Sequence, residues 1–260
     1  MQVTAVRRCC AACALAFLVQ VTGCASNPVD TVWYPSASAW RRGNAEGIAL
    51  LGRDDTIRRV DAAVVQRLSE VVAKLRAVSR VDAQLAVADS ALPNAFAFER
   101  NGRPHIAVSL SFLDALGHDA DALAATLGHE LAHVSLGHRA IRTQRARAGH
   151  AALQGVTTLL TAAGMPLGAI AAGLGLTGMN AAYTRDEERD ADALGLAWAV
   201  AAGYDPCGAY RTLRTLERAA ASAAPIALLD SHPQMQERVQ QADAKAMEAT
   251  QRACGAHAPA

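Results

Sequence analysis

Three of the chain's eight histidines lie in one eleven-residue stretch, GHELAHVSLGH at positions 128–138. His129, Glu130 and His133 form an HExxH pattern. On a helix, residues i and i+4 project from one face about a turn apart, so both imidazoles can bind one zinc ion. Glu130 lies about 100° round the helix from His129, beside the metal position, where a general base of a hydrolase is needed. The pattern predicts half of a catalytic zinc site.

The third histidine of the stretch, His138, faces elsewhere if the helix continues. It lies about 140° round the helical wheel from His133 and about 180° from His129. We therefore expect His138 to cap the end of the helix or to form a hydrogen bond in the core, and not to bind the metal. A catalytic zinc ion usually has three protein ligands, so one ligand must come from elsewhere.

The best candidate for this ligand lies in TRDEERDAD, residues 184–192. Glu188 and Asp192 are four positions apart and share one face of a predicted helix. Glu188 could bind the metal, while Asp192 accepts a hydrogen bond from the outer nitrogen of a ligand histidine and fixes its tautomer. The other acidic side chains of the segment fall on other faces and are expected to be solvated: Asp186, Glu187 and Asp190.

The composition is that of a globular, helix-rich domain that must position these residues. Hydrophobic residues make up 52% of the 260 positions, charged residues 19%, and the net charge is +1. This balance gives no electrostatic case for nucleic acid as a partner. Aromatic residues are scarce at 4%, and the many alanines and arginines favour helices.

The first 23 residues are predicted to be a signal peptide, with a short basic start followed by an apolar run from Cys9 to Val19. Residues 21–24, VTGC, resemble a bacterial lipobox, which implies cleavage before Cys24 and lipid attachment to its side chain. The alternative is an ordinary secretory signal that is cleaved nearby. Residues 24–45 have turn formers and no periodicity, so we expect a lipid-anchored tether.

Two cysteines remain in the domain after the signal peptide and the lipid anchor are set aside, Cys207 and Cys254. An even pair in an oxidising compartment allows a disulfide. The sequence does not give their separation in space, so a disulfide and two free thiols both stay open.

Periodicity predicts the remaining elements. A helix is expected over 56–79, a strand over 83–89, and two strands within 92–110 joined at Asn101-Gly102. Pro104 suggests that the second of these strands begins at a sheet edge. The HExxH helix should run over 120–137 with Asp119 or Asp121 near its N-cap. Helices are then predicted over 184–202, over 207–222 and after Pro233.

Two segments after the HExxH helix leave alternatives open. The arginines of residues 139–147 form either a solvated helix face or a contact with anionic lipid headgroups. Residues 148–183 carry no charged side chain except His150, and glycines and a proline interrupt them. We expect a buried or cleft-covering helical hairpin there, with membrane insertion as the alternative.

Several of these motifs occur in the order found in one enzyme family. HELAH at 129–133, TRxxExxAD at 184–192, AGYDP at 202–206 and SHP at 231–233 with Arg238 resemble the zinc metallopeptidases that include HtpX and the CAAX prenyl endopeptidase. Asn94-Ala95-Phe96 resembles that family's strand before the active-site helix. The resemblance covers roughly residues 60–245. Thr184 departs from it, because serine is commoner there.

The resemblance implies one Zn²⁺ per chain, with His129, His133 and Glu188 as ligands, Glu130 as the catalytic base and Asp192 as the support of a ligand histidine. The SHP segment of the family folds back toward the cleft. His232 could therefore stabilise the oxyanion as a catalytic residue, or occupy the open metal position in a resting state. The alternative is a turn histidine before Pro233.

We therefore expect an α+β, predominantly helical fold: a gluzincin-like domain over 46–250 with a small sheet beside the HExxH helix, and a tail over 251–260. No membrane helices like those of HtpX are expected, which favours a periplasmic, lipoprotein-type member, and no tetratricopeptide domain is expected. Ala25 follows the anchor cysteine, and the lipoprotein sorting pattern then implies the periplasmic side of the outer membrane. An edge strand within 94–110 would hold extended substrates.

The expected function is a zinc metalloendopeptidase that cleaves unfolded or misassembled envelope proteins. The alternative is a zinc-containing, non-catalytic chaperone or assembly factor. Glu130 argues against the alternative, because a purely structural zinc ion needs no base, and such sites usually close with four protein ligands, often cysteines.

Overall fold

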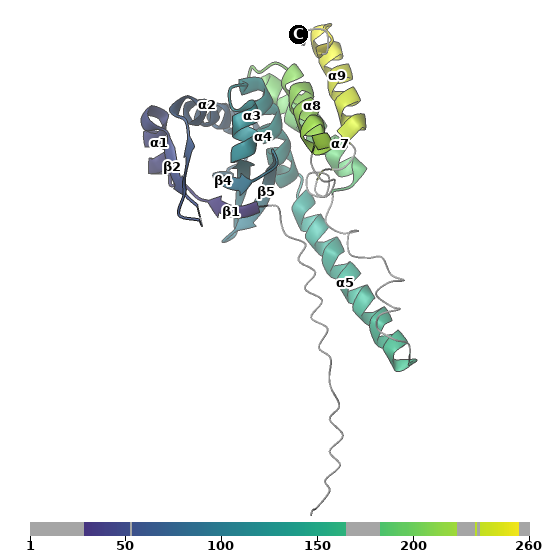
Figure 1. The fold of residues 1–260 in the computed structure, drawn as a ribbon. Coiled ribbons are helices and arrows are strands. Elements are labelled where there is room, and N and C mark those ends of the chain that lie inside the picture. Colours follow the sequence, from purple (N-terminus) through teal and green to yellow (C-terminus); the bar gives the residue numbers. More distant parts are fainter. Residues whose placement is uncertain (1–28, 53, 165–182, 223–231, 233–234, 255–260) are drawn as a thin grey trace, which may run out of the picture.

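The computed structural model describes residues 29–52, 54–164, 183–222, 232 and 235–254 (Figure 1). The expected signal peptide and the lipid-attachment residue Cys24 lie outside the described residues. Within the described residues, most of the chain is helical and a small sheet lies beside the HExxH helix. The expectation of an α+β, predominantly helical fold is confirmed.

A four-stranded sheet forms one side of the molecule, in the order β1-β4-β6-β5. Its strands are β1 (Val29–Trp33), β4 (Gln84–Ser90), β5 (Ala95–Arg100) and β6 (Arg103–Ser109). The pair β4–β6 is parallel, and the other pairs are antiparallel. Asn101 and Gly102 join β5 to β6 with φ values of 53° and 72°, the left-handed conformation that a tight hairpin turn needs.

The expectation that Pro104 starts an edge strand is wrong, because β6 lies between β4 and β5. The paired register with β4 begins only at His105, so the missing N–H of Pro104 removes no hydrogen bond on that side. The free edge within 94–110 belongs to β5. This edge faces the HExxH helix, α4 (Ala120–Ser135).

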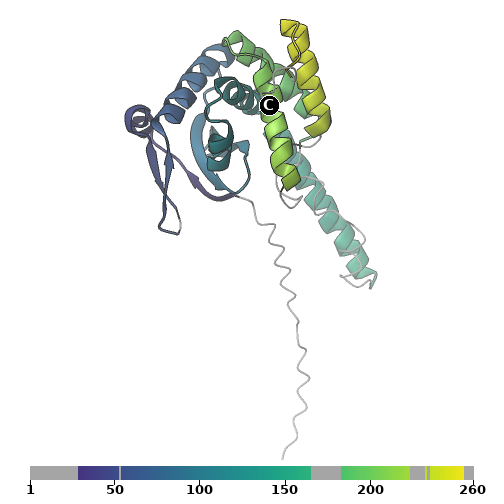
Figure 2. The ribbon, with the colours of Figure 1, turned by 45° about the horizontal axis from the view of Figure 1, so that its top comes forward.

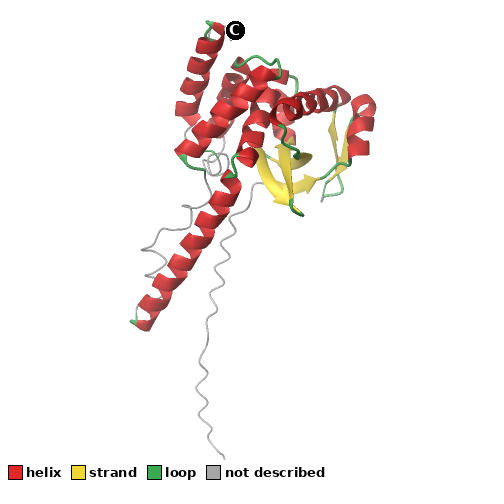
Figure 3. Cartoon of the chain, turned by 180° about the vertical axis from the view of Figure 1, so that it is seen from behind, coloured by secondary structure: helices red, strands yellow, loops and turns green. Residues whose placement is uncertain are grey.

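Helices α2 (Ala62–Ser79), α3 (Leu110–Leu116) and α4 cover one face of the sheet (Figure 3). Their apolar side chains and those of the strands form the main core, which includes Leu68, Leu75, Val87, Ile106, Phe112, Leu123 and Leu127. On its other side α4 contacts α7 (Arg185–Ala201) and α8 (Cys207–Ser222), and α9 (Met235–Thr250) packs on α8 (Figure 2). Helix α4 is thus the central element between the sheet and the C-terminal helices.

Part of the expected tether is instead folded into the domain. Strand β1 pairs with β4, and α1 (Ala37–Glu46) begins after Ser36, whose side chain accepts a hydrogen bond from the backbone N–H of Ala39. A five-residue strand obtains its hydrogen bonds from its partner, so the local pattern gave little signal. The helix expected over 56–79 also begins later, because β3 (Ile57–Val60) pairs with β2 (Ile48–Leu51).

Helix α5 (His138–Ala162) extends away from the rest of the domain (Figure 1). None of the side chains described between 151 and 162 is buried, and Leu159 is 72% exposed. Of the buried or cleft-covering hairpin expected over 148–183, burial is therefore wrong for the residues described between 151 and 162. Residues 165–182 lie outside the described residues. Among the helices that are described, none is long and apolar enough to cross a membrane.

Candidate metal centre

Helices α4 and α7 cross at two glycines, so their backbones approach closely. A β-carbon on Gly128 would lie 2.7 Å from the carbonyl oxygen of Gly195, and one on Gly195 would lie 2.5 Å from the backbone nitrogen of His129. Neither distance is compatible with a side chain. Because Gly195 is on the same face of α7 as Glu188 and Asp192, the crossing brings these carboxylates to the HExxH face of α4.

Four buried side chains meet beside this crossing: His129, His133, Glu188 and His232. Each offers one possible ligand atom, and these atoms lie within 4.8 Å of one another. The Nε2 atoms of His129 and His133 are 3.0 Å apart, and Glu188 Oε1 lies 3.4 Å from His133 Nε2. His232 Nδ1 lies 2.8 Å from the same oxygen of Glu188. The structure thus brings His232 together with the three ligands that the sequence predicts.

The outer nitrogens of the two HExxH histidines have partners of their own. Asp192 Oδ1 lies 2.9 Å from His129 Nδ1, the contact that a support of a ligand histidine requires. His138 Nδ1 lies 3.0 Å from His133 Nδ1. Partners at both Nδ1 atoms orient the rings and leave the Nε2 atoms facing the cluster.

His138 is not one of the four clustered residues, in agreement with its angle on the helical wheel. Its hydrogen-bonding role depends on a break in the helix. Helix α4 ends at Ser135, and Gly137 adopts a φ of 67°, so α5 starts at His138 in a new direction. His138 is therefore buried against His133 and bonds within the core, one of the two roles expected for it.

Burial and neighbouring charges shift the pKa values of three members of the cluster. Burial, together with the charge of His129, lowers the pKa of His133 to about 2, so its ring is neutral at physiological pH. Burial alone would raise the pKa of Glu188, but His232 and a hydrogen bond from His133 lower it below its usual range. Burial alone would lower the pKa of His232, yet the charges of Glu188 and Glu130 raise it. His133 and Glu188 are thus held in the forms that bind metal, a neutral imidazole and an ionised carboxylate.

Glu130 lies between the cluster and the free edge of β5. Its Oε2 accepts a hydrogen bond of 2.8 Å from the backbone N–H of Ala97, and its Oε1 lies 3.5 Å from His232 Nε2. In an antiparallel pair, alternate residues direct their backbone groups away from the partner strand. Ala97 points its N–H and C=O toward α4 and α5, since Arg139 donates to its carbonyl oxygen at 3.2 Å.

Arg238 of α9 holds the two carboxylates of α7. Its Nη2 and Nε donate to Asp192 at 2.7 Å and 2.8 Å, and its Nη1 lies 2.7 Å from Glu188 Oε2. Burial would lower the pKa of Arg238, but Asp192 and Glu188 raise it above its usual range, so this buried guanidinium stays charged. The contact with Glu188 is an ion pair only, because Glu188 Oε2 accepts no hydrogen bond within the described residues.

The basic segment after the HExxH helix also contacts the site. Arg142 lies 4.6 Å above the ring of Tyr183, and that ring stacks on His133 with centroids 3.8 Å apart. Arg145 forms an ion pair with Glu187. Burial, with a smaller contribution from Glu130, raises the pKa of Tyr183 to about 12, so its hydroxyl stays protonated. Arg139, Arg142 and Arg145 therefore bind back to the domain, which neither reading of their sequence anticipated.

The expectation that Glu187 is solvated is wrong. Its backbone N–H donates to the Thr184 hydroxyl at 3.2 Å, and its carboxylate accepts from the Thr184 backbone N–H at 2.8 Å. This reciprocal capping box starts α7 and fixes where Glu188 enters the site. Asp186 and Asp190 are exposed, as expected.

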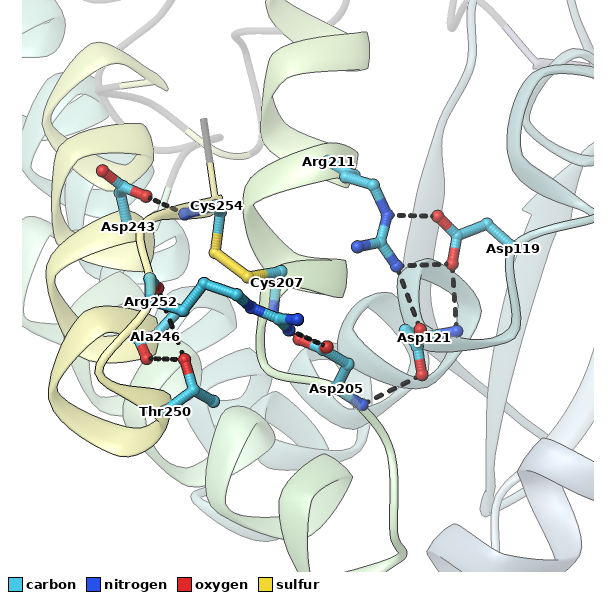
Figure 4. The surroundings of a disulfide bond; sticks show 10 residues. All are labelled: Asp119, Asp121, Asp205, Cys207, Arg211, Asp243, Ala246, Thr250, Arg252 and Cys254. Atoms are coloured by element: carbon cyan, nitrogen blue, oxygen red, sulfur yellow. Dashed lines mark hydrogen bonds and ion pairs between the residues drawn. A yellow bond between two sulfur atoms is a disulfide. The ribbon is translucent and has the colours of Figure 1, made fainter. Parts of the chain in front are cut away.

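A disulfide between Cys207 and Cys254 links the start of α8 to the chain just beyond α9 (Figure 4). Arg211 of α8 pairs with Asp119, the N-cap of α4, at 2.5 Å and with Asp121 at 3.0 Å. Arg252 pairs with Asp205 at 2.5 Å. Residues 251–254 of the expected tail are thus attached to the domain, and α8 and the end of α9 are tied to the start of the HExxH helix.

The donor set fits a zinc ion. Three imidazole nitrogens and one carboxylate are ligands that zinc commonly takes. The buried Oε2 of Glu188, which lies 3.6 Å from His129 Nε2, has no hydrogen-bond partner within the described residues. A buried polar atom left without a partner is costly, and a cation among these four side chains would remove that cost.

A helix bearing HExxH, a glutamate from a second helix and a base beside an edge strand define the zincin class of metallopeptidases. A model of peptidase family M48 matches residues 59–246. The chain therefore belongs to peptidase family M48, whose members are zinc-dependent. No curated protein matches the chain.

Sequence reasoning missed three contributors to the site: the Gly128–Gly195 crossing, the ring of Tyr183 on His133, and the clamp that Arg238 forms. A signal existed for the crossing, because a glycine on the ligand face of a predicted helix indicates a close backbone approach. No such signal existed for Tyr183, which lies one position before the cap of α7, or for Arg238. Their partners, His133 for Tyr183 and Glu188 and Asp192 for Arg238, come from other elements of the fold.

Proposed function

We propose that this member of family M48 is a zinc-dependent endopeptidase that cleaves unfolded or misassembled proteins of the cell envelope. The observation that carries the proposal is the position of Glu130. Its carboxylate touches both the free edge of β5 and a residue of the four-ligand cluster. A base is needed there for hydrolysis of a peptide that lies along the strand, and not for a structural metal.

Different residues of the chain bind the metal, act as the base and hold the substrate. His129, His133 and Glu188 would hold the zinc ion, which when bound supplies a Lewis acid for the scissile carbonyl and lowers the pKa of a water molecule. Glu130 takes the proton of the attacking water and later gives it to the leaving amine. The outward N–H and C=O of Ala97 can hydrogen-bond an extended substrate, once Glu130 and Arg139 release them.

His232 has two roles in this proposal. With its Nδ1 beside Glu188, it completes a four-residue ligand set in the resting protein. When a substrate enters, the ring moves off this position and its N–H donates to the oxyanion that forms. A His232→Ala variant should lose activity and change zinc affinity. Unchanged values of both would remove His232 from the mechanism.

Two features of the chain support an envelope location, and a third supports the class of substrate. The lipobox-like sequence before Cys24 supports a lipid anchor, and a disulfide in the domain suits an oxidising compartment such as the periplasm. An open strand edge beside the base suits unfolded segments as substrates more than folded surfaces. We infer that the anchored protein acts on the periplasmic side of the outer membrane, as a lipoprotein-type relative of HtpX.

One observation favours a second candidate, a zinc-containing chaperone or assembly factor without catalysis. Four protein side chains converge on the cluster, and four protein ligands are typical of structural zinc sites. The two candidates differ in what they require of Glu130.

A Glu130→Gln variant separates them. It keeps the size of the side chain and the acceptor for Ala97, and it should keep one zinc ion per chain. We expect cleavage of casein to fall by about a hundredfold or more, the usual contribution of a general base. Undiminished cleavage or an undiminished envelope phenotype with zinc retained would reject the protease mechanism. Envelope protein fragments that accumulate only in cells with the wild-type protein would identify the substrates.

A further inference from the structure

The distal part of α5, residues 148–162, is exposed and almost free of charge. It carries no acidic or basic side chain except His150. Val156 is 40% exposed, and Leu159, one turn further along the helix, is 72% exposed. Two neighbouring aliphatic side chains on a projecting helix lose free energy in water and gain it in contact with an apolar phase.

The threonines of this part of α5 satisfy their hydroxyl groups within the helix. The hydroxyl of Thr158 donates to the carbonyl oxygen of Gln154 at 2.8 Å, and that of Thr161 donates to the carbonyl oxygen of Thr157 at 2.7 Å. Such bonds let a helix that contains threonine enter a phase in which water cannot supply a partner.

The proposed lipid anchor lies close to the start of the described domain. Strand β1 begins at Val29, five positions after Cys24. A fully extended chain covers at most about 3.5 Å per residue, so a lipid on Cys24 lies within about 18 Å of the start of β1. Because β1 is antiparallel to β4, β4 is parallel to β6 and β5 is antiparallel to β6, β1 begins at the end of the sheet where β5 also begins.

Helix α5 starts beside this sheet and projects from the side of the domain on which β1 lies (Figures 1 and 2). Arg139 in its first turn donates to the carbonyl oxygen of Ala97 of β5. The 25 residues of α5 form a helix about 38 Å long, roughly twice the reach of the tether. A bilayer that holds the lipid of Cys24 is therefore within reach of α5.

The length of the charge-free part agrees with this geometry. If α5 stands upright on the bilayer and the tether is fully extended, about 20 Å of the helix passes the surface, and residues 148–162 span about 22 Å. The hydrocarbon core of a bilayer is about 30 Å thick, so this length enters one leaflet.

The charges of the segment fit an anionic lipid surface. Residues 138–183 contain no acidic side chain, and their arginines all lie in the first part: Arg139, Arg142, Arg145 and Arg147. Arg147 is exposed and directly precedes the charge-free residues. A guanidinium at this boundary lies at the depth of the lipid phosphates when the residues after it are in the leaflet.

We propose that residues 148–162 of α5 form a membrane-contact helix that enters the leaflet holding the lipid of Cys24. The inference goes beyond the proposed peptidase activity and rests on the lipid anchor proposed with it. Residues 138–147 then separate the metal centre from the bilayer surface by about 15 Å. At this height the site reaches unfolded segments that emerge from the bilayer or lie close to it.

Quenching by lipids that carry a nitroxide on the acyl chain tests the contact. The zinc-loaded, lipidated protein is placed on vesicles of phosphatidylethanolamine and phosphatidylglycerol. The same fluorophore is attached to Leu159→Cys and to the control Val200→Cys, because lipid blocks Cys24 and the disulfide blocks Cys207 and Cys254. Val200 is also an exposed aliphatic residue, on α7. We expect quenching at position 159 to be stronger by about fivefold or more, since an interfacial helix buries its apolar face in the leaflet.

A charge on the same face of α5 should abolish the contact. Val156→Glu brings a carboxylate to the turn beside Leu159, and we expect quenching at position 159 to fall to the level at position 200. Cleavage of soluble casein should be unchanged, because Val156 lies outside the metal centre. Val200→Glu is the matched control and should leave quenching at position 159 as it is. Both valines are exposed, so neither substitution disturbs the core.

The outcomes separate the contact from the anchor and from the peptidase activity. Equal quenching at positions 159 and 200 of the lipidated protein would overturn the contact alone, and a chain without lipid on Cys24 would overturn contact and anchor together. Energy transfer between probes at position 159 of different molecules, in place of quenching by lipid, would assign this face to a second copy and overturn the contact. Quenching at position 159 without any cleavage would reject the endopeptidase but support the contact.

Discussion

Helix α4 and helices α7 to α9 contribute to the metal centre in different ways. On α4, His129, Glu130 and His133 lie within five positions, and the helical period alone sets their relative placement. On the other side, Glu188, His232 and Arg238 come from separate segments, and tertiary contacts bring them together. The first half depends on one helix being formed, and the second depends on ion pairs and close packing. Substitutions should therefore act on them unequally.

The largest effect is expected from Arg238→Met, which breaks the second half. It leaves Glu188 and Asp192 buried without their guanidinium partner, and the loss of one member of a buried ion pair costs about 3–5 kcal/mol. Urea unfolding of the zinc-free protein measures the change. Arg189→Met is the matched control, because Arg189 also binds a glutamate, Glu237, across α7 and α9, but at an exposed position. Equal destabilisation by the two would contradict the buried clamp.

Gly195→Ala tests the crossing at which the two halves meet. Its new methyl group would collide with the backbone of α4 at His129, and overpacking of this kind costs about 1–3 kcal/mol. The helices should separate, so zinc affinity should fall together with the melting temperature. Gly155→Ala on α5 is the control, since a β-carbon there meets no atom within 4 Å. That change should stabilise the protein by about 0.5–1 kcal/mol. If Gly195→Ala changed neither zinc affinity nor the melting temperature, the close crossing of α4 and α7 would not be needed to form the metal centre.

Substitutions of the residues that bind the outer nitrogens of His129 and His133 compare the two halves by their effect on zinc affinity. Asp192→Asn weakens the support that α7 gives to His129, and His138→Ala removes the support that the start of α5 gives to His133. Loss of such a partner usually lowers metal affinity by about 10–100-fold. We expect Asp192→Asn to be near the upper value, because it also removes a charge that Arg238 needs. Chelator competition measures both, and a larger loss for His138→Ala would reverse the comparison.

The smallest effect is expected at the start of α4. Burial would raise the pKa of Asp119, but Arg211 and the N–H of Ala122 lower it below its usual value. A carboxyl group whose pKa is lower in the folded than in the unfolded state stabilises the protein at pH values above its unfolded-state pKa, which is about 4. This contribution is lost as the pH falls toward the folded-state pKa. Asp119→Asn keeps the cap but loses the charge. It should cost up to about 1 kcal/mol at pH 7 and progressively less toward pH 3.

Zinc affinity at pH 7 should be unchanged in Asp119→Asn, because Asp119 contacts the first turn of α4 and Arg211 of α8 but none of the four clustered residues. Unfolding curves at several pH values and zinc titrations together check this prediction. A difference in stability that grows as the pH falls would contradict the assigned sign of the pKa shift.

The sequence predicted the parts of the molecule that depend on neighbours along the chain. The HExxH helix, the hairpin turn at Asn101-Gly102 and the shared face of Glu188 and Asp192 follow from local spacing. The prediction for His138 is also correct in part, because its angle on the helical wheel excluded it from the metal cluster. Its contact with His133 could not be foreseen, since the angle assumed a helix that Gly137 interrupts.

The rest could not be predicted, because it depends on partners distant in sequence. The sequence of β1 predicts a tether, because the hydrogen bonds that make it a strand come from β4. The sequence predicts a solvated Glu187, because Arg145, which pairs with it, lies on α5. Arg238 appeared only as a residue of the family resemblance, and its two carboxylate partners become visible only when α9 is placed against α7.

The disulfide has a consequence for an enzyme whose proposed substrates are exposed polypeptide segments. Cys207 and Cys254 are 47 positions apart, and the chain between them includes His232 and Arg238. A peptidase at high local concentration meets its own copies, and a single cut between the two cysteines yields two pieces that the sulfur bridge still joins. Self-cleavage there would therefore not release α9, and the nicked molecule would run as one band on a non-reducing gel and as two after reduction.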